Sequence, residues 1–173
     1  MGVDTGNYIH LLLKHNGGQW RPTAMIGTAH HYGVTVSNLD DVLPFYRDTL
    51  GLEVVSEGHV ERDTEDSEKF EHFVGVDGAV DVEVVFLDAG GCQIELLQYN
   101  HPPGDDAHGA DNNDAGASHF CLEVDDIDAV YEELTDEGIE FIYEPITLSK
   151  GVRVAYMYDP EGNIVELSDR SRM

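Results

Sequence analysis

SHFCLEVDDID, residues Ser118–Asp128, is the stretch of this chain that decides its fold. Apolar and polar side chains alternate from His119 to Val124, which is the period of a strand with one buried face. Asp125 and Asp126 supply carboxylates that cap a helix, and the apolar residues after them have helical spacing. The stretch predicts a half-buried strand that leads directly into a helix, with a histidine at the first position of its other face.

The same pattern occurs earlier in the chain, so the sequence contains an internal repeat. HYGVTV, His31–Val36, matches HFCLEV, His119–Val124, and apolar residues follow both at identical offsets. DAGGCQIE, Asp88–Glu95, matches DPEGNIVE, Asp159–Glu166. Each half reads as a strand, a helix and then three strands. We predict an α+β fold in which two βαβββ modules form curved mixed sheets around a cleft.

The predicted boundaries follow the composition. Residues 1–27 form an N-terminal arm or extension, and residues 28–99 form the first module. Residues 100–117 are rich in Gly, Pro, Asp and Asn, which predicts a linker before the second module at 118–173. Pro44 lies inside the first helical pattern and predicts a kink or a short helix. A strand begins over 52–55, and a helical turn over 67–73 interrupts an otherwise irregular acidic stretch at 56–79.

Acidic residues dominate the composition. Thirty-five Asp and Glu against nine Lys and Arg give a formal net charge of −26. Self-repulsion of this size destabilises a compact state unless salt screens it, and the Debye length falls to ~3 Å at 1 M salt. Because the acids are spread along the whole chain, we favour adaptation to a salty cytosol over binding of a cationic partner. With no basic patch and no long apolar run, we expect no nucleic-acid or membrane binding and a cytoplasmic location.

Four side chains form the candidate site. Strand alternation places His31, Glu95, His119 and Glu166 on the faces that do not pack under the helices. Two imidazoles and two carboxylates suit a borderline divalent metal ion, namely Ni, Fe, Mn, Co or Zn. A lone histidine or glutamate on a strand is usually structural or solvated. Four at symmetry-related positions instead predict a metal-binding cleft. No motif for a nucleotide cofactor is present.

The paired modules, with the sequences HYGVTVSNLDDVLPFYRDTLGLEV, SHFCLEVDDIDAVYEEL and YDPEGNIVEL, resemble the vicinal oxygen chelate superfamily. This group includes glyoxalase I, methylmalonyl-CoA epimerase, extradiol dioxygenases and the fosfomycin and bleomycin resistance proteins. By position, His31, Glu95, His119 and Glu166 match the ligand order of bacterial-type glyoxalase I, and epimerases are similar. The resemblance also implies a homodimer.

The leading interpretation is a divalent-metal-dependent, glyoxalase-like enzyme that transfers a proton next to a carbonyl, as a lyase/isomerase or an epimerase. The metal would stabilise an enediolate, and Glu95 or Glu166 would act as the base. We expect a small-molecule carbonyl, thioester or catechol-type substrate. The residues leave open the substrate, the native metal, which glutamate is the base, whether one chain or two build the site, and the role of residues 1–24.

Two alternatives remain at this stage. An Fe(II) extradiol ring-cleaving dioxygenase would use His31, His119 and Glu166 as a facial triad. It would be favoured by a basic side chain near the cleft, for which the candidates are His59, His72, Tyr99, His101 and Tyr156. The other alternative is a non-catalytic ligand-binding protein of the resistance type. Arg153 either meets an anionic substrate group or pairs with a nearby carboxylate.

Overall fold

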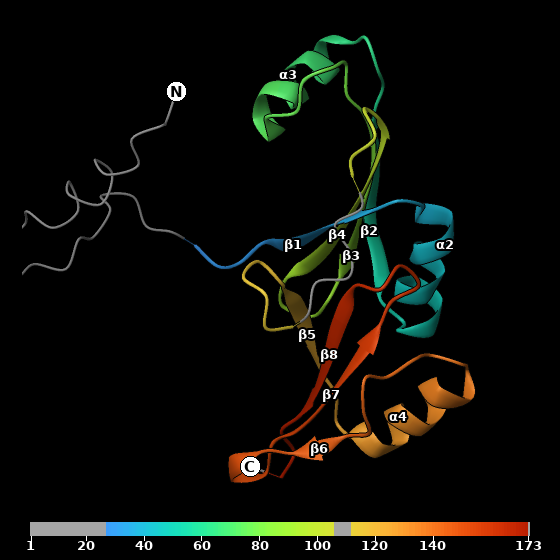
Figure 1. The fold of residues 1–173 in the computed structure, drawn as a ribbon, viewed down its shortest axis with the longest axis vertical. Helices are drawn as coiled ribbons and strands as arrows, with labels where there is room; N and C mark the ends of the chain where they lie inside the picture. Colours follow the sequence, from blue (N-terminus) through green and yellow to red (C-terminus); the bar gives the residue numbers. More distant parts are fainter. Residues whose placement is uncertain (1–26, 106–111, 173) are drawn as a thin grey trace, which may run out of the picture.

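The computed structural model describes residues 27–105 and 112–172, so the predicted arm at 1–27 lies almost wholly outside the described residues. The described chain forms two four-stranded mixed sheets with the strand orders β1-β4-β3-β2 and β5-β8-β7-β6. The predicted α+β fold of two βαβββ modules is confirmed. Figure 1 shows one module above the other, with α2 and α4 along the same side of the molecule.

Each module begins with a strand and a helix. The first contains β1 (His31–Val36), α2 (Leu39–Pro44), a π-helical turn (Phe45–Thr49), β2 (Glu53–Val60), α3 (Glu65–Val74), β3 (Asp81–Asp88) and β4 (Gln93–His101). The second contains β5 (His119–Glu123), α4 (Ile127–Asp136), β6 (Ile146–Thr147), a 3₁₀ turn (Ser149–Gly151), β7 (Arg153–Tyr158) and β8 (Ile164–Asp169). In both modules the first strand pairs in parallel with the last, and the remaining pairs are antiparallel.

Pro44 ends α2, as the sequence predicts. Asn38 caps the start of this helix, because its side chain accepts a hydrogen bond of 3.0 Å from the backbone of Asp40. After the proline the chain continues as a π-helical turn, in which the Leu50 N–H donates to the Phe45 carbonyl at 2.9 Å. The proline therefore limits the α-helix to six residues.

The segment 56–79 is more regular than its sequence indicates. β2 continues to Val60, and the expected turn is a ten-residue helix, α3, capped by Thr64 and ended by Gly75 with φ 69°. β2 is an edge strand whose residues are mostly exposed, and backbone pairing with β3 holds it in place. Because such a strand buries little apolar surface, alternation along the sequence does not reveal its full length.

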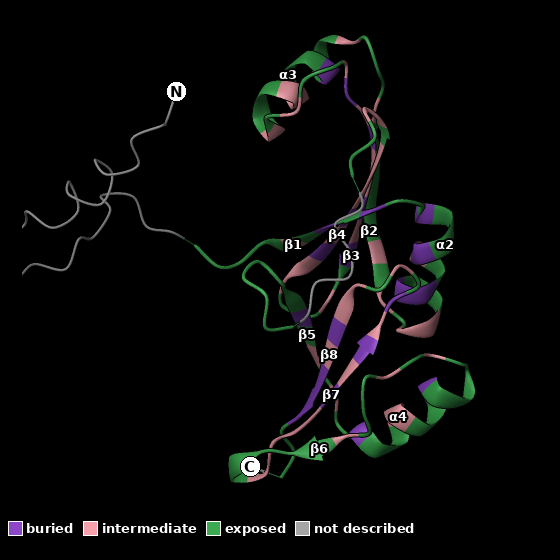
Figure 2. Cartoon of the chain, viewed as in Figure 1, coloured by how far each residue is buried: buried purple, intermediate pink, exposed green. Residues whose placement is uncertain are grey.

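The core lies between each sheet and its helix, as the buried residues in Figure 2 show. Val34, Ile94 and Leu96 are buried on the α2 side of the first sheet, and Val165 and Leu167 are buried in the second. Their strand neighbours point to the opposite faces, where the candidate site lies. In the described part of the chain, no helix is long and apolar enough to cross a membrane.

Candidate active site

In the first module, His31 and Glu95 lie together on the open face of the sheet. His31 Nε2 is 3.4 Å from Glu95 Oε2. Gly33 lies opposite Glu95 in the parallel β1–β4 pair, and a Cβ atom on Gly33 would lie 3.2 Å from Glu95 Oε2. Because Gly33 has no side chain, the Glu95 carboxylate has space beside β1. On the other side, Phe86 lies opposite Glu95 and its ring is 5.6 Å from the His31 ring between centroids.

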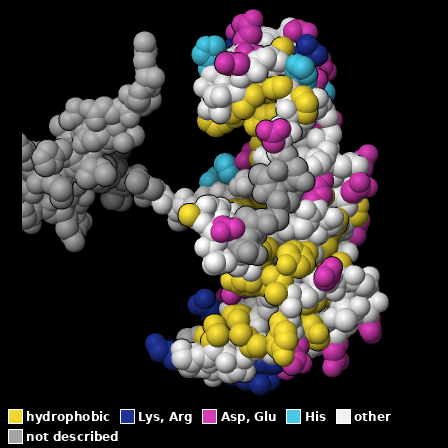
Figure 3. All heavy atoms as spheres, viewed as in Figure 1, with side chains coloured by type: hydrophobic (Ala, Val, Ile, Leu, Met, Phe, Trp, Pro, Cys, Tyr) yellow, Lys and Arg dark blue, Asp and Glu magenta, His cyan; other side chains and the backbone are white. Residues whose placement is uncertain are grey.

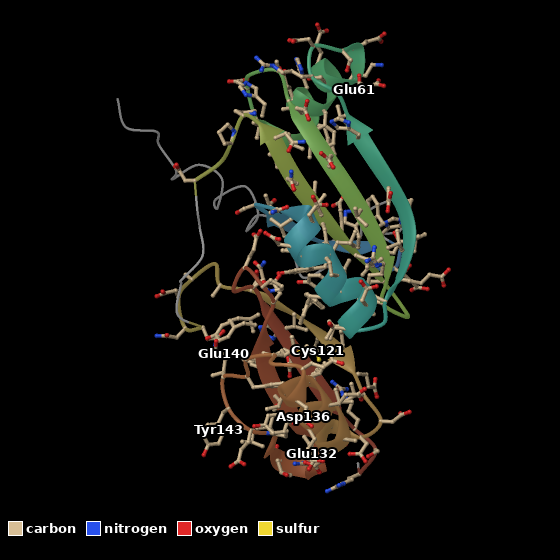
Figure 4. All side chains as sticks on the ribbon, turned by 90° about the vertical axis from the view of Figure 1, so that its right-hand side faces the viewer. Glu61, Cys121, Glu132, Asp136, Glu140 and Tyr143 are labelled. Atoms are coloured by element: carbon tan, nitrogen blue, oxygen red, sulfur yellow. The ribbon has the colours of Figure 1, made fainter. Side chains whose placement is uncertain are left out.

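In the second module, His119 and Glu166 form the equivalent pair. His119 Nε2 is 3.0 Å from Glu166 Oε2, and the Tyr156 hydroxyl is 3.2 Å from the same nitrogen. Cys121, labelled in Figure 4, lies opposite Glu166 on β5. Burial and then the Glu166 charge raise the pKa of the Cys121 thiol to about 11, and the same two causes raise the pKa of Tyr156. Both groups therefore keep their protons at neutral pH.

The two pairs occupy equivalent positions but have unlike neighbours. Glu95 lies between Gly33 and Phe86, which offer no side-chain proton, whereas Glu166 lies between the thiol of Cys121 and the phenol of Tyr156. Neither Gly33 nor Phe86 was predicted as a site residue from the sequence. A signal for Gly33 was available in the repeat, because Gly33 follows His31 at the same offset at which Cys121 follows His119.

Each pair fits two neighbouring positions around one metal ion. Bonds of about 2.0–2.2 Å at right angles place two donor atoms roughly 3 Å apart. The two N–O separations of 3.4 and 3.0 Å are close to this value. Within residues 27–105 and 112–172, however, no cluster of three or more His, Cys, Asp or Glu side chains is able to hold a metal. The structure thus gathers the four predicted residues into two separate pairs, and their role as ligands stays a prediction.

Most of the other candidates make structural contacts. His59 pairs with Asp81 at 2.9 Å, and the His72 ring is 2.8 Å from the Glu68 carbonyl. Arg153 pairs with Asp128, so of the two expected roles the structure shows the ion pair with a nearby carboxylate. Tyr99 lines an open hollow of about 1000 Å³ beside β1, together with Tyr32, Thr35, Ser118 and Phe120 among others. None of the four candidate ligands lines this hollow.

The structure is thus an α+β protein of two βαβββ modules, with equivalent His–Glu pairs on the open faces of its two sheets. The chain belongs to the Glyoxalase/Bleomycin resistance protein/Dioxygenase superfamily, whose family model matches residues 28–167. This confirms the family that the sequence resembles.

Three enzymes illustrate its relatives. Bovine mitochondrial methylmalonyl-CoA epimerase is 30% identical over 153 residues, which cover 84% of this chain and 76% of the relative. Ethylmalonyl-CoA/methylmalonyl-CoA epimerase from Cereibacter sphaeroides is 31% identical, and the match covers 83% of this chain and 98% of the relative. A probable lactoylglutathione lyase from Synechocystis is 29% identical, and the match covers 82% of this chain and 94% of the relative. The chain is thus similar to enzymes of the glyoxalase type.

A solved structure has the same fold. The glyoxalase family protein from Bacillus cereus superposes with a TM-score of 0.75 at 24% identity, covering 87% of this chain and 98% of that protein. The paired-module architecture is therefore shared over most of this chain.

Proposed function

We propose that this protein is a divalent-metal-dependent epimerase that transfers a proton next to the carbonyl of a coenzyme A thioester. The observation that carries the proposal is the presence of His31–Glu95 and His119–Glu166 at equivalent strand positions with matching N–O separations. Similarity to two epimerases named for coenzyme A substrates supports the choice of thioester.

The four side chains would hold the metal through two imidazole nitrogens and two carboxylates. When bound, the metal supplies a positive charge that stabilises the negative charge developing on the substrate oxygen. One of Glu95 and Glu166 would take the proton from one side of the carbon next to the carbonyl, and the other carboxyl group would deliver a proton to the opposite side, which inverts the configuration of that carbon. Tyr156 lies beside His119 as a neutral hydroxyl and restricts the orientation of the imidazole.

We further propose that a homodimer completes the site. Within the described residues of one chain, the two pairs do not form a single cluster. Four ligands around one ion would therefore need one pair from a second chain. In a two-fold dimer, the His31–Glu95 pair of one copy faces the His119–Glu166 pair of a second copy. The same contact repeated by symmetry gives two sites per dimer.

Solvent deuterium exchange tests the proposed activity. The protein is incubated with methylmalonyl-CoA in D₂O with Ni²⁺, Co²⁺, Mn²⁺, Zn²⁺ or Fe²⁺ in turn, and the mass of the ester is followed. We expect incorporation of one deuteron that a chelator abolishes and that Glu95→Gln or Glu166→Gln slows. Absence of exchange by the wild-type protein with every metal would contradict the activity. Full exchange in both variants would contradict a carboxylate base.

One observation favours a second candidate function. The Tyr156 hydroxyl lies next to His119, where an extradiol dioxygenase would place an acid–base group. In that enzyme His31, His119 and Glu166 would bind Fe(II), and Glu95 would have no role. Protein purified without oxygen and loaded with Fe(II) would then consume oxygen with catechols, and Glu95→Gln would leave this rate unchanged. Dependence of deuterium exchange on Glu95 separates the two functions.

A further inference from the structure

The positive charges of the described chain are concentrated at one end of the second module. Four cations lie around the outer ends of β7 and β8: Lys150, Arg153, Arg170 and Arg172. The cations of the first module each pair with an acid close in sequence: Arg47 with Asp48, Arg62 with Asp63, and Lys69 with Glu65. Those three need no ligand to explain them.

The second-module cations are paired less completely. Arg153 pairs with Asp128, and Arg172 Nη2 is 3.9 Å from the same carboxylate. Among the described residues, Lys150 and Arg170 have no carboxylate within ion-pair distance, although the chain carries a net charge of −26. Two exposed cations that have no acidic partner within residues 27–105 and 112–172 are not explained by the stability of the fold.

The backbone brings these cations together. Gly151 has φ +84°, and a Cβ atom there would lie 3.0 Å from the Arg172 carbonyl oxygen, so the missing side chain lets the C-terminal segment approach the 3₁₀ turn. Lys150 has φ 67°, a left-handed conformation that favours glycine or asparagine. The backbone therefore does not select lysine at this position, and the side-chain charge is the property that lysine supplies.

Arg170 lies at the end of the strand that carries Glu166. Arg170 directly follows the last residue of β8 and stands four residues after Glu166, roughly 13 Å along an extended chain. Arg170 therefore lies beyond the candidate metal ligands, at the outer end of the module, and the C-terminal segment that it begins approaches the turn that carries Lys150.

The segment that leads to Lys150 carries exposed apolar side chains. Ile142, Tyr143, Ile146 and Leu148 are 41%, 66%, 46% and 48% exposed. Ile146 pairs with Val154 across β6 and β7, and Val154 alternates with the buried Ala155, so Ile146 lies on the open face. Figure 3 shows hydrophobic side chains beside Lys and Arg at this end of the molecule, and Figure 4 places Tyr143 at its outer edge.

We propose that Lys150 and Arg170 bind the phosphate groups of the substrate, while the exposed apolar side chains of residues 142–148 cover its aliphatic arm. This inference rests on the proposed function, which places the acyl end at the metal ligands. Phosphate groups are best bound by charge-assisted hydrogen bonds from Lys and Arg. Because the rest of the chain repels anions, a cationic end also determines how such a ligand is oriented.

Charge reversal tests the cluster. The variant Lys150→Glu/Arg170→Glu is compared with the control Arg62→Glu/Lys69→Glu, which changes the net charge equally in the first module. Each is assayed with methylmalonyl-CoA and with methylmalonyl-pantetheine, which lacks the phosphates. We expect KM for the coenzyme A ester to rise at least about tenfold in the cluster variant only, with kcat and the pantetheine ester unaffected.

An unchanged KM for the coenzyme A ester, or an equal rise with both esters, overturns the inference. If the wild-type protein converts neither ester, the proposed function fails. Calorimetry with coenzyme A alone then tests the phosphate site by itself. Binding that the control keeps and the cluster variant loses supports the phosphate site. No binding by the wild-type protein, or equal binding by both variants, overturns it.

Discussion

The Tyr46 phenol donates a hydrogen bond of 3.0 Å to the Asp159 carboxylate across the boundary between the two modules. Tyr46 has no exposed surface and Asp159 is 5% exposed. Burial, and then the Asp159 charge, raise the pKa of Tyr46 far above its usual range. Asp159 also accepts hydrogen bonds from the backbone of Glu161 and Asn163, and Glu161 in turn accepts from the backbone N–H groups that precede α2. The turn before β8 is thus fixed to the first module.

Tyr46→Phe is expected to lower the free energy of unfolding by about 1–3 kcal/mol, because it leaves a buried carboxylate with one donor fewer. Urea denaturation at neutral pH measures the loss. Tyr32→Phe is the matched control, since it removes a more exposed bond of 2.8 Å to Ser118 between the same modules. Equal losses in both variants would contradict the claim that burial sets the cost.

Local pattern was sufficient to predict the modules and the composition of each His–Glu pair. Alternation in four short strands assigned His31, Glu95, His119 and Glu166 to the open faces, and strand pairing then brought them together two by two. Parallel pairing of the first and last strand follows from the repeated element order. The site could be predicted to this extent because strand parity is a property of adjacent residues.

The relation between the two pairs could not be predicted in the same way. It depends on how one module packs against the other, through contacts such as Tyr46–Asp159 and the Tyr46–Phe120 ring pair. These residues are far apart in sequence and no periodicity connects them. Helix α3 was underestimated for another reason: only Ser67 of its ten residues is buried, so it carries little of the apolar pattern on which such a prediction depends.

Two inactive variants show whether a site spans two chains. One carries His31→Ala and Glu95→Gln, and the other carries His119→Ala and Glu166→Gln. In a dimer with shared sites, a mixed dimer has one intact site and one site without any of the four ligands. Refolding the variants together should therefore restore about a quarter of wild-type activity, whereas each alone stays inactive. No recovery in the mixture would contradict a shared site.

Tyr156 and Phe86 occupy equivalent positions beside the two glutamates. Tyr156→Phe removes the hydroxyl that lies 3.2 Å from His119 Nε2 and is expected to lower kcat roughly fivefold, because an orienting hydrogen bond contributes about 1 kcal/mol. Metal content should remain as in the wild type, which distinguishes orientation from loss of a ligand. Tyr158→Phe, two residues along the same strand, is the control. Loss of metal from Tyr156→Phe would contradict a purely orienting role.

The ion pair between His59 and Asp81 joins β2 to β3 at 2.9 Å. Its hydrogen bond raises the pKa of His59 and lowers the pKa of Asp81. The contribution of His59 is therefore fully present below its unfolded pKa of about 6.5 and is lost as the pH rises through the raised value. The contribution of Asp81 is present above its unfolded pKa of about 3.9 and is lost as the pH falls through the lowered value.

His59→Gln should accordingly destabilise the protein more at pH ~5.5 than at pH ~9, as measured by urea denaturation at both values. His72→Gln is the control, because it removes the same titrating group from an exposed position on α3. A loss of stability that is equal at the two pH values would show that the pair does not contribute through its charge.

The net charge of −26 predicts that salt stabilises the protein. Since the Debye length shortens from about 30 Å at 0.01 M to about 3 Å at 1 M, the temperature of unfolding should rise steadily over a KCl series that covers this range. A variant with Glu132→Lys, Asp136→Lys and Glu140→Lys removes six units of negative charge from three exposed positions of the second module (Figure 4). It should unfold at a higher temperature than the wild type in low salt and respond less to KCl, because less repulsion remains to be screened. An unfolding temperature that does not depend on KCl, or an unchanged salt response in the variant, would contradict charge repulsion as the cause.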